Sequence, residues 1–270
     1  MTAIKLSPKS RVSEAKGARK AKLLPLPQRF ALHPLKPQVL SVRTIAQVDP
    51  ALAAQLGLPA GHHAAGFITC TSDDALYVAL DEGTKAGRVQ VVYAKSFYAG
   101  SAHASGPLSG EVIGVYASHD IDEVHAALAA CQQCLASEAW FYAADPGQKL
   151  ALFPPVVRWT GHYLSAQAGI AVGEPLAYLI APPLEALIGI DAALKVGGVT
   201  LKKFFGPPTE TNFAGAYLAG DLPSCEAAAE AFAAAVLDVA RSPLQARGSA
   251  RGSGELLGPR PRPADLGSKR

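Results

Sequence analysis

The chain of 270 residues is 49% hydrophobic and 17% charged, so it is long enough to bury the cores of two domains. Its net charge of +3 hides a partition: residues 1–36 hold nine Lys or Arg and one acid, residues 246–270 hold six and two, and the body between them holds ten basic and nineteen acidic residues. Such an acidic body argues against binding to nucleic acid.

The sequence also argues against a membrane protein. Its most apolar stretch, Leu176 to Ile190, is interrupted by Pro182, Pro183 and Glu185, so it is too short and too broken to span a bilayer. The basic amino terminus lacks the apolar run of a signal peptide. Four cysteines without such a signal are typical of a reducing cytosol. We therefore expect a soluble protein of the cytoplasm.

Residues 1–37 combine Lys, Arg, Ala, Ser and Pro without a sustained apolar period, which predicts a disordered or partly helical basic arm. The first domain is expected over 38–147. Apolar alternation predicts strands there, and helical spacing predicts two helices, the first with Ser72 as its N-cap. The predicted strands are 39–48, 66–69, 89–93 and 111–117, and the predicted helices are 73–86 and 121–135.

The second domain, expected over 148–246, repeats this order. Its predicted strands are 156–159, 177–180, 199–205 and 213–219, and its predicted helices are 183–196 and 224–240. Gly197 and Gly198 would end the first helix, and Ser224 would cap the second. Each unit is then an antiparallel or mixed sheet with helices on one side, which places the fold in the α+β class. The tail, 247–270, is rich in Gly, Pro, Arg and Ser and is expected to be disordered.

The two halves also repeat in sequence. Asp81 through Val91 returns at a constant offset of 110 as Asp191 through Leu201, and Val115–Ala117 returns at an offset of 102 as Tyr217–Ala219. The connector in the first copy is therefore about eight residues longer. Two similar modules in one chain usually make a pseudo-symmetric object.

Two loops occupy equivalent places in this repeat, Ser96–Pro107 and Gly206–Asn212. Both are small, polar and rich in Gly or Pro. Equivalent exposed loops of two modules often lie together around a pseudo-symmetry axis, where they could line an opening. The eight extra residues fall in the first loop, which makes it the better candidate for a movable gate.

Long ordered motifs between Val39 and Gln245 resemble the tandem-domain shell proteins of bacterial microcompartments, and among these the L type of ethanolamine-utilisation shell protein. In the first half the resemblance rests on Ser72–Asp74, Gln90–Tyr93, Tyr98–His103 and Gly110–Val112. In the second half it rests on Thr160–Ser165, Ala168–Ile170, Ala177–Ala186, Gly189–Lys195 and Glu210–Asn212. The arm and the tail do not belong to the pattern of this family.

The resemblance implies two circularly permuted microcompartment domains per chain, and a pseudohexameric homotrimer that joins other shell proteins edge to edge. Metabolites would cross by a central pore lined by the two loops. The residues expected to line it are Phe97, Tyr98, Ala99, Gly100, Ser101, Ala102, His103, Pro207, Pro208, Thr209, Glu210, Thr211 and Asn212.

The resemblance also places Lys85 and Lys195 at the edge of the tile, where they would meet a neighbouring tile. The alternative for each is an ordinary solvated lysine at a helix end. Arg241 is a weaker edge candidate, because a cation at the end of a helix also suits the helix dipole.

In the family, a smaller pore in each subunit can bind a protonated amino alcohol such as ethanolamine, and Asp73, Asp74 and Glu111 match its acidic residues. Converging carboxylates suit an ammonium group. For Asp73 and Asp74 the alternative is capping of a helix. Trp140 aligns near an aromatic residue of that site, although Phe141 and Tyr142 compete for the position and packing in the core is favoured.

We expect no metal, cofactor or catalytic residue. Cys131 and Cys134 have the spacing of a metal or redox pair, but they lie in an Ala-rich helix without a second pair and are better interpreted as buried thiols. His103 is interpreted as merely exposed. The chain has neither a Gly-x-Ser-x-Gly elbow nor a phosphate-binding glycine loop.

The sequence therefore predicts a non-enzymatic shell tile with a gated pore, in the shell of a microcompartment in the bacterial cytoplasm. The alternative is a soluble trimeric ligand-binding or regulatory protein that never joins a shell, and an enzyme comes third. Crystalline sheets would favour the tile, whereas a discrete soluble trimer would favour the alternative. Catalytic turnover that is lost on a single substitution would indicate an enzyme.

Overall fold

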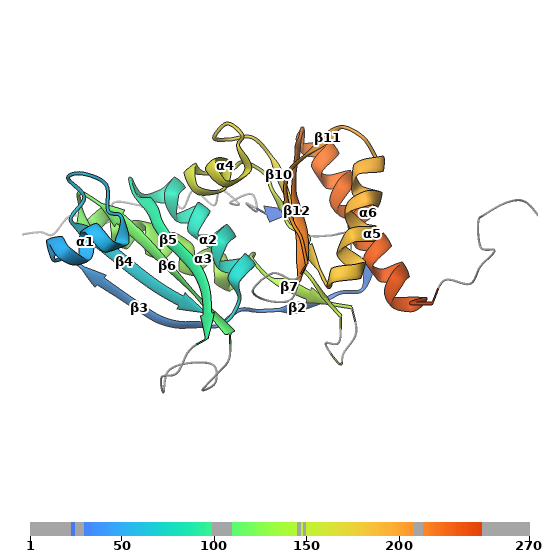
Figure 1. The fold of residues 1–270 in the computed structure, drawn as a ribbon, viewed down its shortest axis with the longest axis horizontal. Helices are drawn as coiled ribbons and strands as arrows, with labels where there is room; N and C mark the ends of the chain where they lie inside the picture. Colours follow the sequence, from blue (N-terminus) through green and yellow to red (C-terminus); the bar gives the residue numbers. More distant parts are fainter. Residues whose placement is uncertain are drawn as a thin grey trace, which may run out of the picture.

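A computed structural model describes residues 23–24, 30–98, 110–144, 147, 150–207 and 213–244 of the chain. The two halves lie side by side, and each has a sheet with two long helices on one face (Figure 1). Among the described residues, none of the helices has both the length and the apolar character that crossing a bilayer requires.

The first half contains a four-stranded antiparallel sheet in the order β3-β4-β6-β5. Its strands are β3 (Val39–Ile45), β4 (Ala64–Cys70), β5 (Gln90–Tyr98) and β6 (Gly110–Ser118). Two helices, α2 (Asp73–Ala86) and α3 (Ile121–Ser137), pack on one face of this sheet. A short helix, α1 (Pro50–Leu56), follows β3, and residues beside and within it pack against the opposite face.

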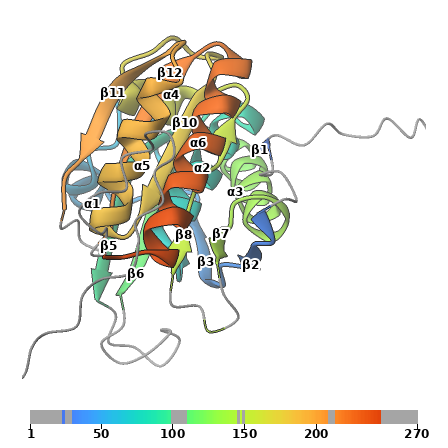
Figure 2. The ribbon, with the colours of Figure 1, turned by 90° about the vertical axis from the view of Figure 1, so that its right-hand side faces the viewer.

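The second half contains a five-stranded antiparallel sheet in the order β1-β9-β10-β12-β11. Its strands are β1 (Leu23–Leu24), β9 (Val156–Val157), β10 (Leu176–Ala181), β11 (Val199–Phe205) and β12 (Ala214–Gly220). The helices α5 (Pro183–Lys195) and α6 (Leu222–Arg241) cover the outer face of this sheet (Figure 2). The short helix α4 (His162–Ala168) lies against α2.

The inner face of the second sheet is covered by the first half. Alternate residues of a strand point to opposite faces, and Tyr178 of β10 belongs to the same core cluster as Leu80 of α2, whereas Leu179 packs with α5 and α6. The molecule is therefore layered as sheet, helices, sheet, helices. The outer face of the first sheet lies at one end of this stack, and the helices α5 and α6 lie at the other.

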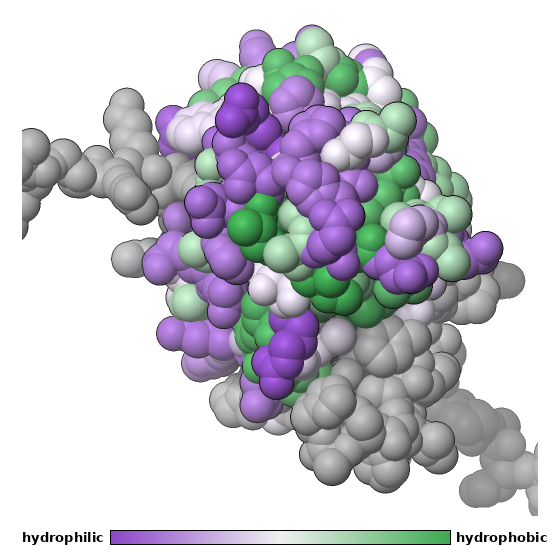
Figure 3. Space-filling model, turned by 90° about the vertical axis from the view of Figure 1, so that its left-hand side faces the viewer, coloured by the Kyte–Doolittle hydropathy of each residue, from purple (hydrophilic) through white to green (hydrophobic). Residues whose placement is uncertain are grey.

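Exposed apolar side chains remain on both halves. In the first half they are Ile45, Leu52 and Tyr93, and in the second half they include Leu184, Leu187, Ile188, Leu201 and Phe204. Figure 3 looks at the end of the molecule that carries α1, where apolar side chains lie among hydrophilic ones.

The residues expected to form a disordered arm contribute two strands. Leu23 and Leu24 pair with Val157 and Val156, and β2 (His33–Leu35) pairs with β7 (Phe141–Ala143), which in turn pairs with β8 (Ala151–Leu152) in a small third sheet. The arm prediction is therefore wrong for these two segments. Their partners lie more than a hundred residues away, so local composition does not reveal them.

The eight principal strands and four long helices agree with the prediction to within five residues at their ends, and Ser72 is the N-cap of α2 as predicted, but the predicted cap of the last helix is wrong. Ser72 occupies the N-cap position of α2, yet its hydroxyl makes no capping hydrogen bond and is buried without a partner among the described residues. The helix α6 begins earlier than expected, and its cap is Asp221, whose carboxylate accepts the backbone N–H of Ser224.

The repeat extends to details that the sequence did not reveal. The helices α1 and α4 have seven residues each and end at Gly57 and Gly169, which lie 112 positions apart and both adopt the left-handed conformation that favours glycine. A register shift between Val91 and Tyr93 recurs between Leu201 and Lys203. Each half is therefore a copy of the same unit, including its short helix.

Candidate functional site

A buried polar cluster on α2 joins the two halves. The Asp81 carboxylate accepts the backbone N–H groups of Gly161 at 2.6 Å and Leu164 at 2.8 Å, and the Thr84 hydroxyl accepts that of His162 at 3.0 Å. These three N–H groups belong to the start of α4, where a helix has no backbone acceptors of its own. Asp81 in the first half thus caps a helix of the second half.

Lys85 lies inside this cluster. Its ammonium group pairs with Asp81 at 3.2 Å and with Glu82, and its side chain is only 15% exposed. Both carboxylates are fully buried. The structure therefore uses this predicted edge lysine to neutralise buried acids within the chain.

Lys195 has different surroundings. It pairs with Asp191 at 2.5 Å, but its side chain is 74% exposed. Arg241 is also exposed and is the last residue of α6. Both side chains are accessible to another molecule, as the edge prediction requires.

Asp73 and Asp74, the predicted ligands of the small pore, lie where the two halves meet. Asp74 is buried, and the Tyr178 hydroxyl of β10 donates a hydrogen bond to its Oδ1. Burial raises the pKa of the Asp74 carboxyl well above its usual range, and the neighbouring Asp73 adds to this. Asp74 therefore lies in the contact between the two halves, which we call the joint. Its carboxyl is neutral over a wider pH range than an ordinary carboxyl.

Asp73 is half-buried, and its Oδ2 accepts a hydrogen bond from the Ser96 hydroxyl of β5 at 3.1 Å. Glu111 of β6 is paired in register with Phe97, the residue that follows Ser96. The backbone of Glu111 is thus brought to the same corner as Asp73.

Tyrosines gather beside this corner, a proximity that the sequence did not reveal. The rings of Tyr178 and Tyr217 meet edge to face with centroids 4.5 Å apart, and Tyr77 lies 6.4 Å from Tyr163. Burial raises the pKa of Tyr178, Tyr217 and Tyr163, so these phenols stay protonated hydrogen-bond donors. The sequence does not show that these tyrosines meet, because they come from four separate elements.

Trp140 has packing partners of its own after the end of α3. Its indole N–H donates to the carbonyl of Leu135 at 2.8 Å, and the Lys36 ammonium lies 4.5 Å from its ring centroid. This agrees with the packing role that the sequence favoured.

The predicted pore loops lie mostly outside the described residues. This applies to Ala99, Gly100, Ser101, Ala102, His103, Pro208, Thr209, Glu210, Thr211 and Asn212. Phe97 and Tyr98 are the last two residues of β5, and Pro207 follows β11 closely. The strands that lead into the two loops occupy equivalent places in the two sheets.

The four cysteines are buried, and no disulfide joins them. Burial raises the pKa of the Cys131 thiol to about 12, which makes it a poor nucleophile. Within the described residues, no three side chains of His, Cys, Asp or Glu converge on one point as a metal site would require.

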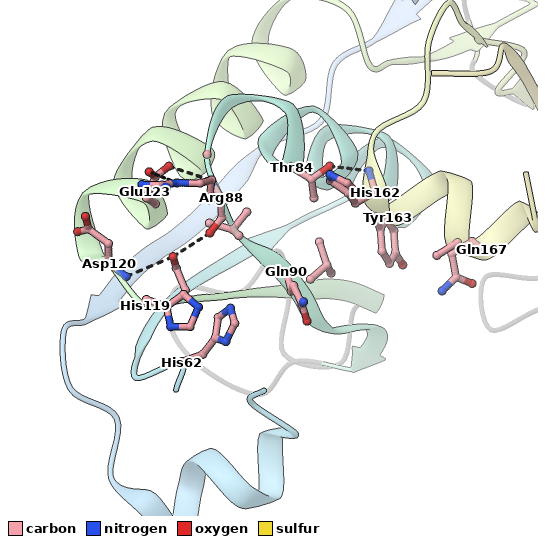
Figure 4. A pocket seen from close by; sticks show the side chains of 15 residues that line it. His62, Thr84, Arg88, Gln90, His119, Asp120, Glu123, His162, Tyr163 and Gln167 are labelled. Carbon is pink, nitrogen blue, oxygen red and sulfur yellow. Dashed lines mark hydrogen bonds and ion pairs between the residues drawn. The ribbon is translucent and has the colours of Figure 1, made fainter. Parts of the chain in front are cut away.

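A cavity of about 1030 Å³ opens between the two halves (Figure 4). One side is formed by the segment after α2 and by the start of α3, where the Arg88 guanidinium pairs with Glu123 at 2.9 Å. The other side is formed by α4. Its polar lining includes His62, Arg88, His119, Glu123, His162 and Gln167. The sequence did not predict this cavity, because its residues come from loops and helix ends far apart in the chain.

Comparison with known proteins identifies the fold family. The family model described as the BMC domain matches residues 64–142. The chain is 49% identical over 210 residues to the bacterial microcompartment shell protein EutL of Clostridium perfringens, which covers 78% of this chain and 97% of the relative. The chain belongs to the EutL family of bacterial microcompartment shell proteins.

A second EutL relative, from Salmonella typhimurium, is 46% identical over 80% of this chain and 98% of its own length. The crystal structure of the ethanolamine utilization protein EutL from Leptotrichia buccalis superposes with a TM-score of 0.75 at 48% identity, covering 80% of this chain and 99% of that one. The tandem-domain architecture expected from the sequence is thus that of EutL, and the two main sheets are antiparallel.

Proposed function

We propose that this chain is a structural tile of a bacterial microcompartment shell of the ethanolamine-utilisation type. The observation that supports this function is the sequence identity of 49% over 97% of the length of the shell protein EutL from Clostridium perfringens. The tile lies in the shell, within the bacterial cytoplasm, and contributes a pore for small metabolites. We assign it no enzymatic activity, as its named relatives are shell proteins.

Three chains form the tile, and we derive their contact from the joint inside one chain. In that joint, α2 of the first half covers the inner face of the second sheet. The equivalent helix of the second half is α5, and its residues Leu184, Leu187 and Ile188 are exposed. The equivalent sheet face of the first half carries Phe67, which is only half-buried.

Individual residues correspond across this repeat. Phe67 is paired with Val115 in the first sheet just as Tyr178 is paired with Tyr217 in the second. Asp74 of α2, which meets Tyr178, corresponds at the offset of 110 to Leu184 of α5. A second chain can therefore place Leu184 against Phe67 of the first, so that an apolar pair replaces the polar pair of the joint.

This contact is head to tail, because it joins α5 of one chain to the first sheet of the next. Head-to-tail contacts form closed rings when the rotation between subunits closes. With two units per chain, three chains would make a ring of six. Burial of the Leu184 side chain, now 56% exposed, would contribute to the stability of the ring.

The trimer is tested by measuring the mass of the chain in solution by sedimentation. Wild type should be a trimer, and Leu184→Asp should shift it towards monomer. Leu244→Asp is the matched control, because Leu244 is 91% exposed beyond the end of α6. A monomeric wild type would contradict the trimer, whereas a trimer unaffected by Leu184→Asp would contradict only this contact.

The small pore is proposed at the corner formed by Asp73 and Glu111, with the ammonium group of an amino alcohol such as ethanolamine as its ligand. Charge-assisted hydrogen bonds from ammonium to carboxylate favour this pairing. Asp74 supports the corner through Tyr178. Calorimetric titration with ethanolamine should show at least tenfold weaker binding for Asp73→Asn than for wild type or for the control Asp49→Asn. Equal affinities would contradict the site.

We further propose Lys195 and Arg241 as tile-edge contacts, and the loops after β5 and β11 as the lining of the central pore. Lys85 serves the joint rather than the edge, because its charge is already matched by two buried carboxylates. We also propose that the first unit ends near residue 147 and the second near residue 246.

A further inference from the structure

Two histidines lie side by side at the cavity between the halves. His62 precedes β4 and His119 follows β6, and their ring centroids are 4.1 Å apart with planes tilted by 33° (Figure 4). His119 is exposed and His62 is half-buried, so the pair can be reached from the cavity. The function proposed above makes no use of this pair.

The hydrogen bond of His119 fixes where its lone pair lies. Its Nδ1 is 3.0 Å from the carbonyl oxygen of Gly61. Because a carbonyl only accepts, Nδ1 carries the proton in the neutral ring and Nε2 carries the lone pair. Histidines that bind metals usually donate their other ring N–H to a carbonyl or carboxylate in this way.

One ring nitrogen of His62 lacks the polar partner that a buried nitrogen normally has. Its Nδ1 is buried and has no hydrogen-bond partner among the described residues. Leaving such an atom unsatisfied destabilises a folded protein. A ligand that accepts the lone pair of this nitrogen would remove the penalty, which gives a second and independent reason to expect an ion here.

We propose that His62 and His119 together bind one divalent transition-metal ion, of the class of Zn²⁺, Ni²⁺ or Cu²⁺. Imidazole nitrogens suit these ions. Since no third ligand among the described residues converges on this point, water from the cavity completes the coordination. The ion connects the Gly61 turn to the segment between β6 and α3.

Binding requires the two rings to turn as well as to separate. The lone pair of an imidazole nitrogen lies in the plane of its ring, and the present ring planes are tilted by only 33°, so His62 Nδ1 and His119 Nε2 must rotate towards one ion, which brings the buried Nδ1 to the cavity. Because Zn–N bonds are about 2.1 Å long, two imidazoles on one ion hold their ring centroids about 5 Å apart, so the rings would also separate by about 1 Å. Both rings lie outside helices and strands, where such a movement does not disturb a ladder of backbone hydrogen bonds.

The test is calorimetric titration of the full chain, without a histidine tag, with ZnSO₄ and separately with NiCl₂. Wild type should bind one ion per chain. Binding should weaken at least tenfold in His119→Asn, whose amide can still donate to the Gly61 carbonyl, and in His62→Phe, which keeps the stacked ring. The control His125→Asn removes an exposed histidine of α3 and should bind like wild type.

Circular dichroism of each variant checks that it is folded, and a metal-induced rise in melting temperature that is lost in His62→Phe and His119→Asn would support the site further. The proposal is overturned if wild type binds neither ion, or if both variants, folded, bind as wild type does. It is also overturned if His125→Asn weakens binding as much as they do, since the ion would then sit on scattered surface histidines.

Discussion

The sequence Asp-x-x-x-Lys occurs at the same place in both halves, but its surroundings differ. In the first half, Asp81 and Lys85 are enclosed by α4 and form the joint of the molecule. In the second half, Asp191 and Lys195 form an exposed pair. The difference arises from the neighbour and not from the motif, because α4 covers α2 whereas no described segment covers α5 in the same way.

The largest effect is expected at Asp81. Asp81→Ala removes the acceptor of two N–H groups and leaves Lys85 beside a single buried acid, which should cost about 3–5 kcal/mol of unfolding free energy. Asp191→Ala should cost less than about 1 kcal/mol, because exposed ion pairs contribute little. Urea denaturation of both variants measures the difference. A loss for Asp81→Ala as small as that expected for Asp191→Ala would show that Asp81 does not stabilise the joint.

The lysines should differ in the same direction. Lys85→Met leaves Asp81 and Glu82 without a cation and should cost about 3 kcal/mol. Lys195→Met should change stability by less than about 1 kcal/mol, but should reduce the assembly of tiles into sheets if Lys195 lies at the edge. Denaturation and electron microscopy of assembled protein separate the two outcomes. If Lys195→Met forms sheets as extensive as those of wild type, Lys195 does not lie at the edge of the tile.

A smaller effect is expected at the starts of the two short helices. A Cβ at Gly161 would lie 2.4 Å from the Thr84 hydroxyl oxygen and 2.7 Å from the Asp81 carbonyl oxygen, so Gly161→Ala should cost about 1–3 kcal/mol through overpacking. The equivalent residue 112 positions earlier is Asp49, which caps α1. Asp49→Ala should cost about 1 kcal/mol. Thermal unfolding compares the two variants. A larger loss of stability for Asp49→Ala than for Gly161→Ala would contradict the close contact at Gly161.

The last effect concerns Asp74, whose counterpart Leu184 cannot titrate. Because the folded pKa of Asp74 is raised, the folded state holds its proton more tightly than the unfolded state. The stability it contributes is full below the ordinary carboxyl pKa and is lost as pH rises through the folded pKa. Asp74→Asn cannot lose a proton, and its amide oxygen can still accept from Tyr178.

The stability of Asp74→Asn relative to wild type should therefore increase as the pH is raised from 4 towards 8. Denaturation midpoints measured at several pH values test this. A constant difference between the two proteins would mean that Asp74 does not titrate across this range.

The comparison of the two motifs also shows what could be predicted from the sequence. The main strands and long helices have clear apolar periods, so they were predicted correctly. The helices α1 and α4 were missed because seven residues are too few to establish a period. The joint was missed because a carboxylate four residues before a lysine is equally typical of a solvated helix surface. Only the three-dimensional neighbour decides which of these applies.

The candidate site was predicted in part for a similar reason. Asp73 and Asp74 were proposed through the family resemblance, but Tyr178, which packs on Asp74, lies about a hundred residues away, and its motif does not reveal that the two side chains meet. His62 and His119 lie in loops, where no periodicity indicates that their rings will meet. Pairings between distant loops depend on the packing of the whole chain.

The strand β1 has a consequence for the order in which the protein is made. Leu23 and Leu24 leave the ribosome early, yet their partners Val157 and Val156 are synthesised more than a hundred residues later. Contacts of such long sequence separation form slowly. The first half can collapse while translation continues, but the amino-terminal strand must wait for the second sheet. A chain cut between the two halves would therefore leave the second sheet without its edge strand, so duplication of the unit has not produced two independently folding pieces.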